Sequence, residues 1–342
     1  MTSQQQDDDI EASTPFSGCT IEKLPSGQVI SISSKGAVDL ERWESMPSLA
    51  PFPDLQSLEL HKSRYIPDLA GSGVDQLPQL KRLHLTRCSR LTRLPDSIGQ
   101  LTQLQVLDLT DSELIGSLPD SIGSLKNLVS LRLGSHHSSG NKVLTELPES
   151  LGNLSKLEEL LIDKCKSLQS IPKSIGNLQS LRVLQMRECK CVSELPESIG
   201  NLKGLVELGL SKCMGLTQLP RSFGHLTRLE DLVLAKCKNI ASLPDELGDC
   251  TALCWLDLRN CKKLVTLPET LGNLGRLRFL DLSGCKALTF VPPYRLPKLE
   301  TLDVSNCLEL KSLPDTFQGV KNVVGAPGGT NGQSEKGNDG AL

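Results

Sequence analysis

The sequence is poor in aromatic residues, has no long apolar run and carries no excess of basic charge. Phe, Trp and Tyr together make up 3% of the 342 residues, so leucine must fill the core. No apolar run approaches the ~18 residues of a membrane-spanning helix, and the polar start MTSQQQDDDIEAS lacks the basic and apolar parts of a secretory signal. The formal net charge of −3 argues against a nucleic-acid partner. The composition therefore predicts a cytoplasmic protein that binds neither nucleic acid nor a membrane.

The sequence also lacks the short motifs of common enzyme families. It contains no GxSxG, no HExxH and no glycine-rich phosphate loop. The adjacent histidines His136 and His137 have no cysteine nucleophile or acidic residue at a recognisable spacing. We therefore expect that the chain is not an enzyme and needs no cofactor.

The most regular feature that is present is a recurring proline. Consecutive members of one series are 24 residues apart, at Pro148, Pro172, Pro196, Pro220, Pro244 and Pro268. A period of this length is typical of a solenoid, in which each repeat buries its apolar face by stacking on its neighbours. The unit at 181–204, LRVLQMRECKCVSELPESIGNLKG, fits LxxLxLxxCxxLxxLPxxIGxLxx and resembles a leucine-rich repeat. Leu184 and Met186 alternate with Gln185, which predicts a short strand with the apolar side chains inward.

The repeat predicts an α/β solenoid, a leucine-rich-repeat horseshoe with a parallel concave β-sheet. We expect about eleven 24-residue repeats, each with a helical or 3₁₀ turn opposite its strand. The insertion around 136–143 adds five residues and forms a surface loop or part of a binding face. The expected organisation is a disordered acidic N-terminus at 1–19, an N-terminal cap at 20–54, the solenoid at 55–318 and a disordered Gly-rich tail at 319–342. The last strand, around Leu302 to Val304, then has an open edge that either frays or supports weak self-association.

Cysteine recurs seven residues before the repeat proline. The series comprises Cys165, Cys189, Cys213, Cys237, Cys261 and Cys285, with Cys88 and Cys307 at its ends. A small buriable thiol at this point can bond backbone groups that the turn after the strand exposes. Metal ligands must converge on one point, whereas these residues are spaced by one strand each. The pattern predicts structural thiols, no metal site and a reducing compartment.

The outward strand positions contain the candidate binding residues. Trp255 and Phe279 occupy equivalent positions in consecutive turns, and Arg259 lies nearby, which is the composition of an interface hot spot. The alternative is that both rings only lie flat over neighbouring side chains. The aspartates Asp257, Asp281 and Asp303 stack similarly; they either bind protons, a cation or a basic partner, or are solvated acids that keep the face soluble. The full candidate set is Trp255, Phe279, Asp257, Arg259, Asp281, Val233, Arg187, Gln185 and Leu161.

Two longer segments carry a resemblance to a known family. LPESIGNLKGLVELGLSKCMGLTQLP and LPETLGNLGRLRFLDLSGCKALTFVP resemble the leucine-rich domains of plant intracellular disease-resistance receptors of the nucleotide-binding, Toll-domain-bearing kind. The resemblance implies a protein-binding role in recognition or regulation during defence or signal transduction. The chain has no GxxxxGK[ST] loop, so it either acts alone or receives its signalling parts from another polypeptide.

Other roles for the same repeat stay open. The LPxxIGxLxxL core is also similar to intracellular scaffolds of the Ras pathway, which usually carry asparagine where this chain has cysteine. The alternatives are therefore a constitutive scaffold of a Ras or kinase pathway, or a regulatory subunit of an enzyme.

Overall fold

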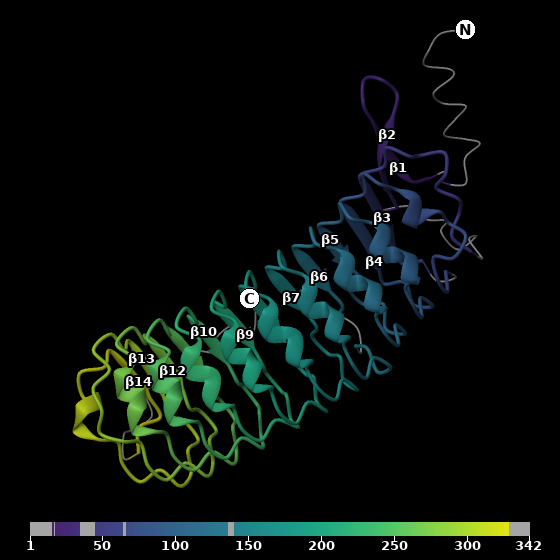
Figure 1. Ribbon diagram of the computed structural model, residues 1–342. Coiled ribbons are helices and arrows are strands. Elements are labelled where there is room, and N and C mark those ends of the chain that lie inside the picture. Colours follow the sequence, from purple (N-terminus) through teal and green to yellow (C-terminus); the bar gives the residue numbers. More distant parts are fainter. Residues whose placement is uncertain (1–15, 17, 35–44, 64–65, 136–139, 328–342) are drawn as a thin grey trace.

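The computed structural model describes residue 16 and residues 18–34, 45–63, 66–135 and 140–327. These residues form a curved array of turns, each with a strand on one side and, in most turns, a short helix on the other (Figure 1). All strands belong to one fourteen-stranded sheet, in which their spatial order is their order in the sequence. The predicted solenoid is therefore confirmed.

The strands are short and evenly placed along the chain. They are β1 (Thr20–Lys23), β2 (Val29–Ser33), β3 (Ser57–His61), β4 (Arg82–Thr86), β5 (Val106–Asp108), β6 (Ser130–Arg132), β7 (Glu159–Leu161), β8 (Val183–Gln185), β9 (Glu207–Gly209), β10 (Asp231–Val233), β11 (Trp255–Asp257), β12 (Phe279–Asp281), β13 (Thr301–Asp303) and β14 (Asn322–Val324). β1 and β2 pair antiparallel, and every later pair is parallel. The eleven strands from β3 to β13 correspond to the eleven repeats read from the sequence.

The turns opposite the strands are 3₁₀ helices rather than α-helices. They are η2 (Val74–Gln76), η3 (Asp96–Gln100), η4 (Asp120–Ser124), η5 (Glu149–Asn153), η6 (Lys173–Asn177), η7 (Glu197–Asn201), η8 (Arg221–His225), η9 (Asp245–Asp249), η10 (Glu269–Asn273) and η11 (Asp315–Phe317). The repeat proline directly precedes most of them; Pro196, for example, has φ −68° and ψ 148°. Its fixed φ and missing N–H suit the residue at which a helical turn begins.

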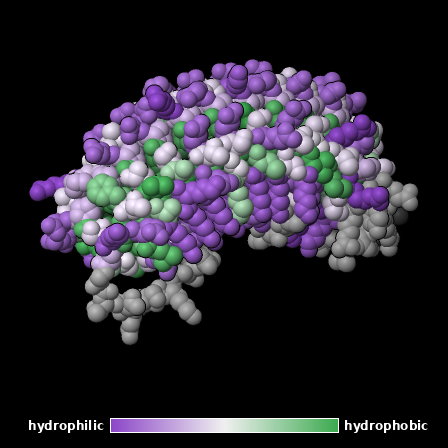
Figure 2. Space-filling model, turned by 90° about the horizontal axis from the view of Figure 1, so that it is seen from below, coloured by the Kyte–Doolittle hydropathy of each residue, from purple (hydrophilic) through white to green (hydrophobic). Residues whose placement is uncertain are grey.

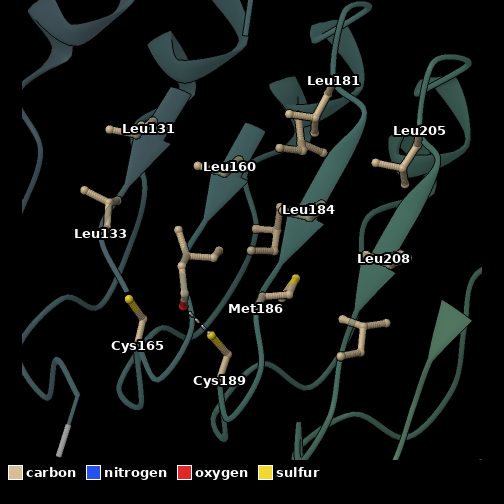
Figure 3. Packing of buried hydrophobic residues seen from close by; sticks show 14 of the residues in the cluster. Leu131, Leu133, Leu160, Cys165, Leu181, Leu184, Met186, Cys189, Leu205 and Leu208 are labelled. Carbon is tan, nitrogen blue, oxygen red and sulfur yellow. Dashed lines mark hydrogen bonds between the residues drawn. The ribbon is translucent and has the colours of Figure 1, made fainter. Parts of the chain in front are cut away.

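Leucines from successive turns fill the interior. Leu160, Leu184 and Leu208 are neighbours in the strand register and are buried, and the other apolar repeat positions surround them (Figure 3). Each turn therefore buries its apolar face against the turns before and after it, as the repeat period predicts.

In most repeats a cysteine of the series from Cys88 to Cys307 lies in the turn that follows the strand. These stacked cysteines form a ladder along the array. The thiol of Cys189 donates to the carbonyl of Ile162 at 3.1 Å, in the preceding turn (Figure 3). The same bond, at 3.0–3.2 Å, recurs at Cys213, Cys237, Cys261, Cys285 and Cys307. The prediction that the thiols bond backbone groups is confirmed for these six cysteines. At the N-terminal end of the series the Cys88 sulfur lies 4.0 Å from the Leu60 carbonyl oxygen, and the Cys165 thiol makes no such bond to a described residue.

Two turns without cysteine fill the ladder position with another donor. Ser112 Oγ donates to the Leu85 carbonyl at 2.7 Å, and Asn141 Nδ2 donates to the Ile115 carbonyl at 2.8 Å. Asn141 lies two residues after the segment 136–139 of the insertion, which is outside the described residues. The insertion therefore contains a residue that keeps the hydrogen bond of the ladder position.

The C-terminal end corrects one prediction. β14 pairs with β13 along its length, and the Val304 amide donates to the Val324 carbonyl at 2.9 Å. The open edge expected around Leu302 to Val304 is therefore wrong, as is disorder at 322–324. The segment NVV continues the sheet without carrying the leucine pattern of a repeat, which is why the sequence reading missed it.

At the other end, the β1–β2 hairpin extends the sheet through β2, which pairs with β3. Residues 35–44 of the expected cap lie outside the described residues, as do 1–15, 17 and the tail from 328 onward.

Candidate protein-binding surface

The outward side chains of β9 to β13 form two rows across the concave face. The first row contains Glu207, Asp231, Trp255, Phe279 and Thr301. The second row contains Gly209, Val233, Asp257, Asp281 and Asp303. Between the rows, the middle residue of each strand is a buried leucine, such as Leu256 on β11. The inward and outward positions are therefore those that the period-two pattern predicts.

The aromatic pair in the first row is stacked and accessible. The ring centroids of Trp255 and Phe279 are 3.7 Å apart, and the ring planes differ by 11°. Trp255 is 42% exposed, and Phe279 is half-buried. The face of the molecule in Figure 2 is mostly hydrophilic with limited apolar patches. Because aromatic residues make up only 3% of the chain, an exposed aromatic pair is uncommon here, and aromatic side chains are enriched at the centres of protein interfaces.

The acids Asp257 and Asp281 of the second row are buried. Asp257 is 4% exposed and Asp281 is 7% exposed. Each accepts a hydrogen bond from the amide two residues later, at 3.0 Å from Arg259 N and 2.8 Å from Ser283 N. The interpretation of these aspartates as solvated acids is therefore wrong, because they fix the turn at the end of the strand.

Burial also changes the protonation of these carboxyls. Desolvation raises the pKa of Asp257 to about 6, against the opposing effect of the Arg259 backbone hydrogen bond and charge. Desolvation likewise raises the pKa of Asp281, and the nearby Asp303 carboxylate adds to the effect. Burial is therefore the main cause of the raised proton affinity of these two groups, and the stacking of carboxylates adds to it.

Arg259 forms an ion pair with Asp257 of the second row and is therefore not an unpaired cation. Its Nε lies 3.1 Å from Asp257 Oδ2. Its charge is therefore largely compensated, although about half of the side chain is exposed.

The remaining candidates lie on the same face but in two groups. Val233 is next to Asp257 in the register. Leu161 and Gln185 are neighbours on β7 and β8, and Gly209 separates Gln185 from Val233. Arg187 bonds back to Gln185, with Nε 3.2 Å from Oε1. The structure thus joins Val233 to the aromatic group and leaves Leu161, Gln185 and Arg187 several strands away.

Glu207 and Asp231 were not singled out from the sequence, although they belong to the row that contains Trp255. Burial raises the pKa of Asp231, and the Glu207 and Glu230 carboxylates add to the effect. The available signal was the acidic residue at one outward position in two consecutive turns, directly before the aromatic pair.

The repeat identifies the class of protein. A family model described as "Leucine-rich repeat region" matches residues 38–188 and 161–254, and a second, "Leucine Rich Repeat", matches 252–274. The chain therefore belongs to the leucine-rich repeat family. Such domains generally mediate protein–protein interaction and present an extended concave surface.

Solved structures agree with this assignment. The leucine-rich repeat domain of the type III effector XopL is similar at 32% identity and a TM-score of 0.57, over 65% of this chain and 74% of that one. The functional domain of InlJ from Listeria monocytogenes, whose description includes a cysteine ladder, has the same fold at 22% identity and a TM-score of 0.52. That match covers 78% of this chain and 54% of InlJ. A comparison with curated protein sequences gives no match.

Two further features of the described residues bear on binding. None of their helices is both long and apolar enough to cross a membrane. Within the same residues, no group of three or more His, Cys, Asp or Glu side chains is placed to hold a metal ion.

Proposed function

We propose that the chain is a non-catalytic protein-binding module whose partner docks on the concave face over β9–β12. The observation that carries this proposal is the stacked pair of Trp255 and Phe279, which places aromatic surface in contact with solvent. Exposed apolar area on a soluble protein commonly marks an interaction site. Stacking also fixes both rings before the partner arrives, which lowers the entropy cost of ordering them on binding.

The proposed biological role is recognition or regulation in cytoplasmic signalling, including defence. The resemblance of the repeats to those of plant intracellular receptors supports this role. The chain has twelve cysteines, all with free thiols, which suits a reducing compartment. A constitutive scaffold or a regulatory subunit would use the same surface, and the identity and constancy of the partner distinguish these roles.

Affinity capture from extracts of the source cells tests the proposal. The wild type is compared with Trp255→Glu/Phe279→Glu, which introduces charge at the centre of the surface. Val106→Glu is the matched control, because Val106 occupies the same outward position on β5, several strands away. Circular dichroism must be unchanged in both variants.

We expect partners of the wild type and the control to be missing from the double variant. Capture under resting and stimulated conditions then separates a conditional partner from a constant one. Identical partner lists for all three proteins would contradict docking at this surface.

A further inference from the structure

One face of the Trp255 ring is open toward β10. The rings of Trp255 and Phe279 are nearly parallel at 3.7 Å, so Phe279 on β12 covers one face of the indole. Strand order places β10 on the opposite side of β11, and Asp231 is the register neighbour of Trp255 there. The open face of the indole therefore lies toward the Asp231 side chain.

The carboxylates on this side have no cationic partner among the residues that the structure describes. Neither Glu207 nor Asp231 accepts a side-chain hydrogen bond or forms an ion pair with any residue in the described part of the chain. The two are adjacent in the register, and the pKa of Asp231 is raised by burial and by its acidic neighbours. Two like charges side by side on a sheet are mutually destabilising, so a cation at this point would relieve repulsion.

Two arginines on or next to strands of the N-terminal half of the sheet are paired with acids of the chain. Arg132 Nη2 lies 2.9 Å from Glu159 Oε2, and Arg87 Nε lies 3.3 Å from Asp111 Oδ2. These two arginines therefore add little uncompensated positive charge to the sheet. Among the described residues, Glu207 and Asp231 are acids beside the aromatic pair that form no ion pair.

Two arginines close to the aromatic pair in the sequence are also paired with acids. Arg259 is held by Asp257, and Arg278 Nη2 lies 2.9 Å from Glu300 Oε1. Neither arginine brings an uncompensated positive charge to the surface formed by Glu207, Asp231, Trp255 and Phe279.

We propose that this surface binds a basic segment of the protein partner, with an arginine guanidinium over the open face of Trp255 and paired to Asp231. The proposal rests on the proposed function and names the chemistry of its partner. Arginine fits better than lysine, because its planar guanidinium stacks on an aromatic face while donating two parallel hydrogen bonds to a carboxylate. Glu207 is placed to receive a second basic side chain of the same segment.

A displayed library of random peptides, selected on the full chain, is the probe that tests this proposal. Selected peptides are then measured by calorimetry against the wild type, Trp255→Glu and Glu207→Gln/Asp231→Asn. The control Asp245→Asn/Glu269→Gln removes the same charge from the neighbouring turns η9 and η10, on the opposite side of the array (Figure 1).

We expect the selected peptides to be enriched in arginine and to lose about tenfold in affinity in Glu207→Gln/Asp231→Asn. The control should bind like the wild type, and an arginine-to-lysine peptide should bind more weakly. Peptides that need Trp255 but show no basic enrichment, or bind the Glu207→Gln/Asp231→Asn variant equally well, would overturn this inference and leave the proposed function standing. If no selected peptide depends on Trp255, both proposals fail.

Discussion

Trp255 and Phe279 stand opposite each other on adjacent parallel strands, with their rings stacked 3.7 Å apart. Parallel strands in register repeat every ~4.8 Å, so equivalent side chains in consecutive turns must be neighbours. The 24-residue period of the sequence is therefore the direct cause of the pair. The same periodicity places Asp231 on the other side of Trp255.

The two sides of the strand should respond differently to truncation. Leu208 is 1% exposed, so Leu208→Ala should lower the free energy of unfolding by roughly 2–5 kcal/mol. Trp255→Ala removes a partly exposed ring and should cost far less stability while weakening partner binding. Urea denaturation of both variants checks this. Unfolding of the array by Trp255→Ala would mean that the inward and outward positions are assigned incorrectly.

The ladder thiols should be unreactive in the folded protein. Burial raises the pKa of Cys237 to about 12, whereas Cys191 is exposed. Since the thiolate is the reactive form, iodoacetamide near neutral pH should label Cys191 first and Cys237 only after unfolding. Mass spectrometry of timed samples measures both rates. Equal labelling of the two cysteines in the native protein would refute the structural role of the ladder.

Glycine in the 3₁₀ turn should be irreplaceable where the next turn approaches closely. A Cβ on Gly123 would lie 2.5 Å from the Ser150 carbonyl oxygen, so Gly123→Ala must displace backbone. We expect a loss of roughly 1–3 kcal/mol in the free energy of unfolding, as for overpacked cores. Gly275→Ala is the control, because a Cβ there meets nothing within 4 Å. Equal stability of the two variants in thermal melts would contradict the close stacking of turns.

Asp257 should make the stability of the fold depend on pH. Its pKa is raised from 3.8 to about 6, so between these values the folded protein binds more protons than the unfolded chain. The group therefore favours folding at low pH, and this contribution is lost as the pH rises through about 6. Asp257→Asn should remove a decrease on the order of 2–3 kcal/mol across this window. Denaturant titrations from pH 4.5 to 7.5 test this. If the free energy of unfolding changed with pH equally in wild type and variant, Asp257 would not be responsible.

The regular part of the fold was predictable because one residue pattern recurs without interruption. Leu184 and Met186 alternate with Gln185, and this period of two fixes which side chains enter the core. The position of Trp255 next to Phe279 follows from the period alone, whereas the parallel stacking of their rings does not. A feature that repeats with the turns can thus be read from the sequence.

The features that were missed depend on neighbours rather than on the period. Asp257 occupies an outward position of its repeat, which predicts a surface residue, but it is buried in the array. Ser112 and Asn141 replace cysteine with different donors, so they break the visible pattern while keeping the hydrogen bond. β14 joins the sheet through backbone pairing, and its residues do not carry the leucine pattern that would predict a strand.

Hydroxyl-radical footprinting of the captured complex tests the central claim most directly. Trp255 should be oxidised more slowly when the partner is bound, because the partner would cover the exposed ring. Phe290, which is 52% exposed and lies outside β12, is the internal reference and should keep its rate. Undiminished oxidation of Trp255 in a saturated complex would show that the partner binds elsewhere on the molecule.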